Sequence, residues 1–209
     1  MKRRDNQACE TLDYYVVRAS IRAALIRVLP SFDGVLLDVG CGDMPHKHLV
    51  LQKNRNVSQY IGLDIPNPRY SGRPDLEWNG RRIPLRERSV DCAMATEFFE
   101  HCDNIDCVLL EIHRVLRCGG MLFFTVPFLW PLHDVPEDEY RYTPFALERH
   151  LRSAGFAEVN IRALGGWNAA LAQMIALWVR RAPMCRIGRW WLSHLSAPVV
   201  RKLFKTDQK

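Results

Sequence analysis

The chain has 209 residues and a mass of 24.2 kDa, enough to bury the core of one domain, or of one domain with an appended segment. Apolar residues make up 48% and charged residues 25%, a balance that excludes disordered, collagen-like and fibrous chains. The formal charge of +6 is uneven, because residues 1–164 carry 21 Lys or Arg against 22 Asp or Glu, whereas residues 165–209 carry eight against Asp207 alone. The basic character therefore belongs to the tail.

Cysteine usage and the apolar runs indicate in which cellular compartment the chain is expected. Seven cysteines form no CxxC pair, and several lie within apolar runs, which favours reduced thiols in the cytoplasm. The basic first ten residues are followed by charged and polar residues rather than by the apolar stretch of a signal peptide. The longest mostly apolar run covers residues 165–179, fewer than the roughly 20 residues that a bilayer requires. We therefore expect neither a secretion signal nor a transmembrane helix.

The predicted elements begin with a helix and continue with alternating strands and helices. Apolar residues at helical spacing predict a first helix over residues 11–29, which Pro30 ends. The short apolar runs that follow are typical of strands covered on both faces. Predicted strands are residues 35–39, 60–65, 75–78, 90–95, 121–126 and 156–161; predicted helices include residues 105–116 and one opened by Thr143 and Pro144 and ended by Gly155. This order predicts an α/β fold with an open, mostly parallel sheet.

A glycine turn follows the first predicted strand. VLLDVGCGDMP places Gly40 and Gly42 where the backbone turns tightly and can approach a ligand. Asp64 ends the second predicted strand, 22 residues after Gly42, and can accept hydrogen bonds from ribose hydroxyls. This combination favours a nucleotide site over the alternative of a tight turn and a solvated aspartate.

The surroundings of the glycine turn narrow the class of nucleotide. Pro45 stands where a dinucleotide fingerprint has its third glycine, and the chain has no GxxxxGK[ST] phosphate loop. The acidic residues Asp38, Asp43 and Asp64 favour a ligand with a ribose and a cationic group over a polyphosphate. A sulfonium nucleoside fits this description.

Four ordered motifs resemble those of class I S-adenosylmethionine-dependent methyltransferases: LLDVGCGD, GLDI, SVDCAMATEFFEH and EIHRVLRCGGMLFFTVP. The similarity covers residues 33–163 and implies a Rossmann-like, doubly wound sheet with S-adenosyl-L-methionine as the cofactor. It also implies the cofactor-binding residues: Asp38, Gly40 and Gly42 at the methionine end, Asp64 at the ribose, Asn79 near the adenine, and Glu97 from the fourth-strand motif. Met44 replaces a common third glycine, Asn79 stands where an aspartate is often seen, and no seventh strand is found after residue 162.

The catalytic candidates lie in the loop after the fifth predicted strand, where loops face the ligand crevice. Its sequence HDVPEDEYRYT contains His133, Asp138 and Arg141, and histidine is the usual general base near neutral pH. The segment resembles a PF…H…P.D..R.T signature of methyltransferases that act in surface-glycan and glycolipid biosynthesis. We expect His133 to be the base, Arg141 to position the acceptor and Asp138 to belong to the same site. The alternative is a solvated loop in which Thr143 caps the next helix.

No metal site is expected from the sequence. His46 and His48 have no third ligand at a recognisable spacing, and Glu97 and Glu100 alone do not form a carboxylate cluster for magnesium. His101, a second candidate base, is expected to be structural, because it can cap the following helix or pack against the loop.

The chain thus divides into a methyltransferase domain, residues 1–164, and a basic, tryptophan-rich helical tail, residues 165–209. Pro183 separates two tail helices. The apolar face of the first contains Trp167, Leu171, Met174, Ile175 and Trp178, and that of the second contains Ile187, Trp190, Trp191 and Leu195. Tryptophan-rich faces among arginines predict docking on an anionic membrane surface. The alternatives are that these faces pack on the sheet or form a homodimer interface.

These observations predict an O-methyltransferase that acts on a hydroxyl of a saccharide or lipid-linked glycan. One alternative is a methyltransferase that acts on RNA or on another small molecule. A pI of 9.1 favours RNA, but the charge-balanced core argues against nucleic acid as a partner. A further alternative is a non-catalytic, cofactor-binding scaffold domain.

Overall fold

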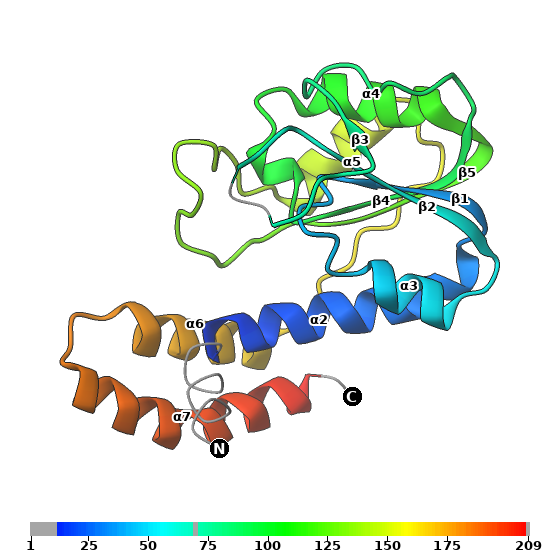
Figure 1. Ribbon diagram of the computed structural model, residues 1–209. Coiled ribbons are helices and arrows are strands. Elements are labelled where there is room, and N and C mark those ends of the chain that lie inside the picture. Colours follow the sequence, from blue (N-terminus) through cyan, green and yellow to red (C-terminus); the bar gives the residue numbers. More distant parts are fainter. Residues whose placement is uncertain (1–11, 69–70, 208–209) are drawn as a thin grey trace. The chain divides into compact units, whose positions relative to one another are not determined.

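The computed structural model describes residues 12–68 and 71–207, which form two compact units (Figure 1). Residues 26–162 form the larger unit, which contains the sheet. Residues 12–25 and 163–207 form the smaller unit, which is helical.

The sheet has five parallel strands in the order β3-β2-β1-β4-β5 within the described residues. The strands are β1 (Gly34–Val39), β2 (Val57–Asp64), β3 (Leu76–Glu77), β4 (Val90–Thr96) and β5 (Leu116–Thr125). The strand order reverses between β1 and β4, which pair with Asp38 opposite Met94. Ligands of such sheets bind at this reversal, beyond the carboxyl ends of the strands. The Rossmann-like α/β prediction is confirmed.

Helices cover both faces of the sheet, with α4 (Ile105–Val115) and α5 (Pro144–Ser153) on one face and α3 (Lys47–Lys53) on the other (Figure 1). Helix α4 buries the apolar stripe that its sequence predicts, from Ile105 through Val115. Asn104 caps α4 by accepting a hydrogen bond of 3.1 Å from the amide of Cys107, and Thr143 caps α5 ahead of Pro144. Short 3-10 helices, η1 (Leu29–Ser31) and η2 (Phe99–His101), precede β1 and follow β4.

The predicted sixth strand is wrong, because residues 156–161 contain no strand in the structure. The amide of Phe156 donates a hydrogen bond of 3.1 Å to the carbonyl of Leu151 and so closes the end of α5. Phe156, Val159 and Ile161 are partly buried against the core of the larger unit. Their uneven spacing does not match the two-residue period of a strand, so they reach the core as irregular chain.

The smaller unit consists of α2 (Leu12–Val28), through its residues up to Leu25, together with α6 (Trp167–Arg181) and α7 (Arg186–Thr206). Its core contains Leu12, Val16, Ala169, Ala172, Ala176, Val200 and Phe204. The sequence grouped the first helix with the methyltransferase domain, whereas in the structure residues 12–25 pack with the tail helices, because Leu12 and Val16 are buried there. No helix of the described residues is both long enough and apolar enough to cross a membrane.

Candidate active site

The turn after β1 contains two glycines in the left-handed region, Gly40 with a φ of 69° and Gly42 with a φ of 50°. A Cβ atom at Gly40 would lie 2.2 Å from the ring of Phe98, so a larger residue does not fit there. The amide of Gly40 donates a hydrogen bond of 2.9 Å to the carbonyl of Leu63 in β2. The predicted turn is therefore present and is attached to the neighbouring strand.

Asp64, the last residue of β2, lies beside this turn and is 5% exposed. Its Oδ2 accepts a hydrogen bond from the amide of Gly42, and its Oδ1 accepts one from the amide of Ile65, both at 2.7 Å. Burial raises the pKa of Asp64, and these two hydrogen bonds partly offset the increase. Because a carboxylate oxygen can accept more than one hydrogen bond, the predicted contact with ribose hydroxyls stays compatible with this geometry.

Asp38 is a buried carboxylate within β1, and it is 2% exposed. The hydroxyl of Tyr60 donates a hydrogen bond to Oδ2, whereas Oδ1 has no hydrogen-bond partner among the described residues. Burial raises the pKa of Asp38 to about 7. A buried, unpaired carboxylate oxygen is unfavourable until a donor or a cation meets it, so this position favours a positively charged ligand group.

Asn79 shapes the chain after β3. It is exposed, and its Oδ1 accepts hydrogen bonds of 3.0 Å from the amides of Arg81 and Arg82. This pattern is an asparagine-stabilised turn. The contact of Asn79 with adenine stays a prediction.

Glu97 follows β4 with a φ of 51°, and its amide donates a hydrogen bond of 3.0 Å to the carbonyl of Thr125. Burial raises the pKa of the Glu97 carboxyl; a hydrogen bond with the Thr125 side chain and the charges of His133 and Arg141 act in the opposite direction. Glu97 is therefore electrostatically coupled to the predicted catalytic loop, and its contact with the cofactor stays a prediction.

The loop after β5 brings His133, Asp138 and Arg141 together. Nδ1 of His133 lies 3.0 Å from Oδ2 of Asp138, which also accepts a hydrogen bond of 3.0 Å from the His133 amide. The guanidinium of Arg141 donates to both oxygens of Asp138, at 2.6 and 2.7 Å. This bidentate pair holds the pKa of Asp138 well below its usual range, so the carboxylate stays ionised and orients the imidazole.

Arg141 is itself held by the backbone of the loop. Its guanidinium donates hydrogen bonds to the carbonyls of Trp130, Pro131 and Tyr140, at 2.8 to 3.3 Å. These contacts explain how one arginine fixes the shape of an irregular loop. A direct contact between Arg141 and an acceptor stays a prediction.

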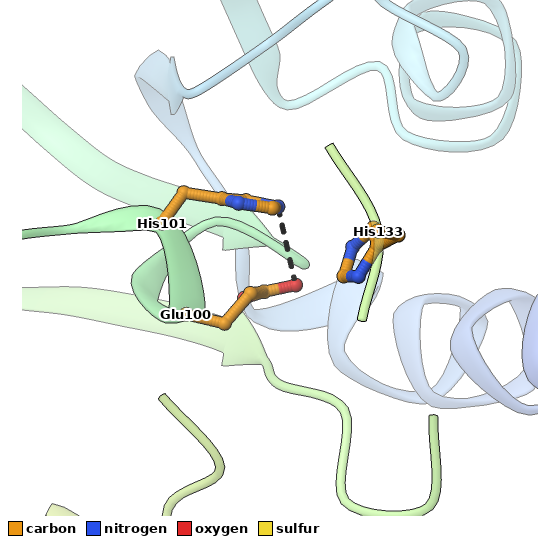
Figure 2. A group of neighbouring side chains, drawn as sticks. All are labelled: Glu100, His101 and His133. Carbon is orange, nitrogen blue, oxygen red and sulfur yellow. Dashed lines mark ion pairs between the residues drawn. The ribbon is translucent and has the colours of Figure 1, made fainter. Parts of the chain in front are cut away.

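The structure also brings together three residues that the sequence analysis did not combine, namely Glu100, His101 and His133 (Figure 2). Glu100 is fully buried, and its Oε1 lies 3.8 Å from Nε2 of His101. Burial, with the charge of Glu97 as the second cause, raises the pKa of Glu100 to about 8. His101 packs edge-on against His133, with ring centroids 5.0 Å apart. The available sequence signal was the Glu-His pair directly after the fourth strand.

Comparisons with known proteins indicate the class of protein to which the chain is similar. Residues 37–124 match the methyltransferase domain family. The chain is 27% identical to an uncharacterized methyltransferase of Mycobacterium bovis over an alignment that covers 93% of this chain and 85% of the relative. It is 26% identical to a ubiquinone/menaquinone biosynthesis C-methyltransferase of Methylobacterium nodulans, over 65% of this chain and 71% of that protein.

Solved structures show the same fold. The [4+2]-cyclase SpnF has a TM-score of 0.59 and 21% identity, and the match covers 91% of this chain and 77% of the cyclase. An S-adenosylmethionine-dependent methyltransferase from Mesorhizobium loti has a TM-score of 0.54 and 16% identity, over 67% of this chain and 82% of that one. The family match and the fold together support a methyltransferase, and they imply S-adenosylmethionine as the cofactor.

The residues at the carboxyl end of β1 fit this cofactor. S-adenosylmethionine carries a sulfonium and an ammonium group, and the buried, unpaired Oδ1 of Asp38 suits a cation. The turn at Gly40 has no room for a Cβ atom because the ring of Phe98 lies against it, so glycine is required there. The carboxylate of Asp64 is fixed at the end of the neighbouring strand, where it can accept hydrogen bonds from a ribose.

Proposed function

We propose that the chain transfers a methyl group from S-adenosylmethionine to a hydroxyl of a saccharide or lipid-linked glycan. The observation that carries this proposal is the hydrogen-bonded series His133, Asp138 and Arg141. The cofactor supplies an electrophilic methyl group when bound. A hydroxyl acceptor becomes a better nucleophile when a nearby base removes its proton.

His133 is arranged to be that base. Because Asp138 is ionised, it accepts a hydrogen bond from Nδ1–H of His133, and the lone pair of the neutral imidazole then lies on Nε2. An imidazole oriented by a carboxylate in this way is suited to take a proton and to be stabilised as a cation. In this proposal Arg141 has a positioning role through Asp138, in addition to its predicted contact with the acceptor.

The acceptor class rests on the resemblance of this loop to the glycan-associated signature. Phe128, Leu132 and Val135 are exposed on the same loop, at 65%, 71% and 64%. They provide apolar surface next to His133 in the sequence, which suits the lipid portion of a lipid-linked acceptor.

We also propose that the smaller unit docks on an anionic membrane surface. Trp167, Leu171, Met174 and Trp178 recur along one side of α6 and are exposed, and Ile187, Trp190, Trp191 and Leu195 are exposed on α7. Basic residues on the same helices, including Arg180, Arg181 and Lys202, are exposed too. Exposed tryptophans together with basic side chains are typical of helices that lie in a lipid interface, and they suit an enzyme whose acceptor is attached to a lipid.

The direct test incubates the chain with isotopically labelled S-adenosylmethionine and four acceptor pools: lipid-linked glycans, free oligosaccharides, RNA and a small-molecule metabolite extract. We expect the label on a sugar hydroxyl, located by mass spectrometry, and we expect it to disappear in the His133→Ala variant. Label on RNA or on a non-sugar small molecule would assign the chain to the alternative acceptors. Tight cofactor binding without transfer to any pool would support the scaffold alternative. His48→Ala, an exposed histidine of α3, is the matched control.

A further inference from the structure

The cluster of Glu100, His101 and His133 has the composition of a metal site. One ligand atom from each residue can be chosen so that all three lie within 4.8 Å of one another. Figure 2 shows Glu100 and His101 pointing toward one another from a single short segment, with His133 opposite them on the separate loop after β5. Residues from two parts of the chain therefore converge on one point.

Glu100 is an unusual residue to find at that point. Its side chain is fully buried, and neither carboxylate oxygen has a hydrogen-bond partner among the described residues. Its contact with His101, at 3.8 Å, is too long to be a hydrogen bond. Buried carboxylates are normally hydrogen-bonded, paired or coordinated to a metal, so this side chain lacks a partner of adequate strength.

Nε2 of His101 lies 3.8 Å from Oε1 of Glu100, and His133 offers a ring nitrogen to the same cluster. Nδ1 of His101 lies 3.1 Å from the backbone carbonyl of Glu137, an atom that can only accept, so Nδ1 carries the proton. Nδ1 of His133 is held in the same way by Asp138, at 3.0 Å. In the neutral form of each ring the lone pair therefore lies on Nε2. Histidines that ligate metals usually have this arrangement, with the other ring nitrogen held by a carboxylate or a backbone carbonyl.

We propose that Nε2 of His101, Nε2 of His133 and the carboxylate of Glu100 bind a divalent transition-metal ion. Two imidazoles and one carboxylate favour ions such as Zn²⁺ or Co²⁺ over Mg²⁺, which prefers oxygen ligands. Three protein ligands leave at least one position for a water or an oxygen of another molecule. The assignment of that other molecule as the hydroxyl acceptor rests on the proposed function. The metal site itself does not.

The metal and the base make different demands on the same atom. A bound ion uses the lone pair of Nε2 of His133, so His133 is a general base only in the metal-free chain and cannot accept a proton there while the ion is bound. An acceptor oxygen bound to the ion would instead have its own pKa lowered by the metal. Metal binding can be measured without measuring turnover. A chain that binds no metal can therefore be distinguished from a chain that transfers no methyl group.

The test uses the full chain, stripped with a chelator and dialysed, and titrates it with Co²⁺ by calorimetry and by visible absorption. We expect one ion per chain and the d–d bands of a nitrogen- and oxygen-ligated ion. His101→Ala and the isosteric Glu100→Gln should each weaken Co²⁺ binding at least tenfold. Asp138→Asn, which removes the ionised partner of His133, should weaken it by roughly 10- to 100-fold.

His48→Ala is the control variant and should bind Co²⁺ like the natural chain, because His48 is exposed on α3 and outside the cluster. Circular dichroism establishes that each variant is folded, and Glu100→Gln replaces His101→Ala if the latter does not fold. The proposal is overturned if the natural chain binds no Co²⁺ in stoichiometric amount. It is equally overturned if Mg²⁺ binds as tightly as Co²⁺, or if His48→Ala weakens binding as much as His101→Ala.

Discussion

The carboxylate of Asp64 accepts a hydrogen bond of 2.7 Å from the amide of Gly42, a residue 22 positions earlier in the chain. This contact joins the end of β2 to the glycine turn after β1. The same carboxylate is thus a structural support of the turn and the predicted partner of the ribose.

Asp64→Ala should weaken binding of S-adenosylmethionine by on the order of 1.5–3 kcal/mol, because it removes a charged hydrogen-bond acceptor. Calorimetric titration of the folded variant measures this change. Asp103→Ala is a suitable control, since Asp103 is exposed and its ion pair with Arg81 lies at the surface. An affinity that stays the same in folded Asp64→Ala would remove Asp64 from the cofactor site.

Gly40→Ala should destabilise the fold more than Gly80→Ala does. Both glycines are in the left-handed region, with φ of 69° and 76°, so both substitutions carry a backbone penalty of about 1–2 kcal/mol. A Cβ at Gly80 meets open space, whereas a Cβ at Gly40 meets the ring of Phe98. Denaturant unfolding should therefore show a larger loss for Gly40→Ala, and equal losses would show that the contact with Phe98 yields easily.

The fold and the glycine turn were predictable because local sequence determines them. The buried strands β1 and β4 are continuous apolar runs, and Gly40, Gly42 and Asp64 occur at the ends of such runs. Residues 156–161 have strand-like composition, but a local pattern does not show that Phe156 is used to close α5.

The rest of the site depends on contacts between distant residues. Glu100 and His133 are 33 positions apart, and the path of an irregular loop decides whether they meet. Arg141 organises that path through backbone carbonyls, which side-chain motifs do not encode. The packing of residues 12–25 with α6 and α7 is likewise a long-range contact that the periodicity of the first helix does not specify.

The stability of the cofactor-free chain should depend on pH through Asp38. Its pKa is raised from 3.8 to about 7 in the folded state, so between these values the folded state retains a proton that the unfolded state has lost. The contribution of Asp38 to stability therefore declines as the pH rises from about 4 to about 7. Asp38→Asn lacks this dependence, so its free energy of unfolding relative to the natural chain should be higher at pH 8 than at pH 5. A difference that is the same at both pH values would show that Asp38 ionises normally.

Membrane docking predicts that the full chain sediments with anionic vesicles at low salt and is released at high salt, because basic residues contribute about 1 kcal/mol each near anionic lipid. The double variant Trp167→Ser and Trp178→Ser should remain in the supernatant. Phe145→Ser controls for loss of an exposed apolar side chain elsewhere, since Phe145 lies on α5 and is 80% exposed. Equal sedimentation of the double variant and the natural chain would contradict docking through α6.

Truncation of the tail is not an equivalent experiment. Removing residues after 164 would expose Leu12 and Val16, which are buried against α6 and α7. The truncated chain would then carry a new apolar surface of its own, so point variants of the full chain are the better choice.

The most direct test of the proposed function compares the natural chain with His133→Ala in the transfer of labelled methyl to the acceptor identified from the lipid-linked and free glycan pools. We predict a loss of turnover of roughly 100- to 10,000-fold, the usual effect of removing a general base. Affinity for S-adenosylmethionine should change little, because His133 is held by Asp138 in the loop after β5 and not by the glycine turn. Turnover that stays within a factor of a few of the natural chain would contradict the account, because it would show that methyl transfer proceeds without His133.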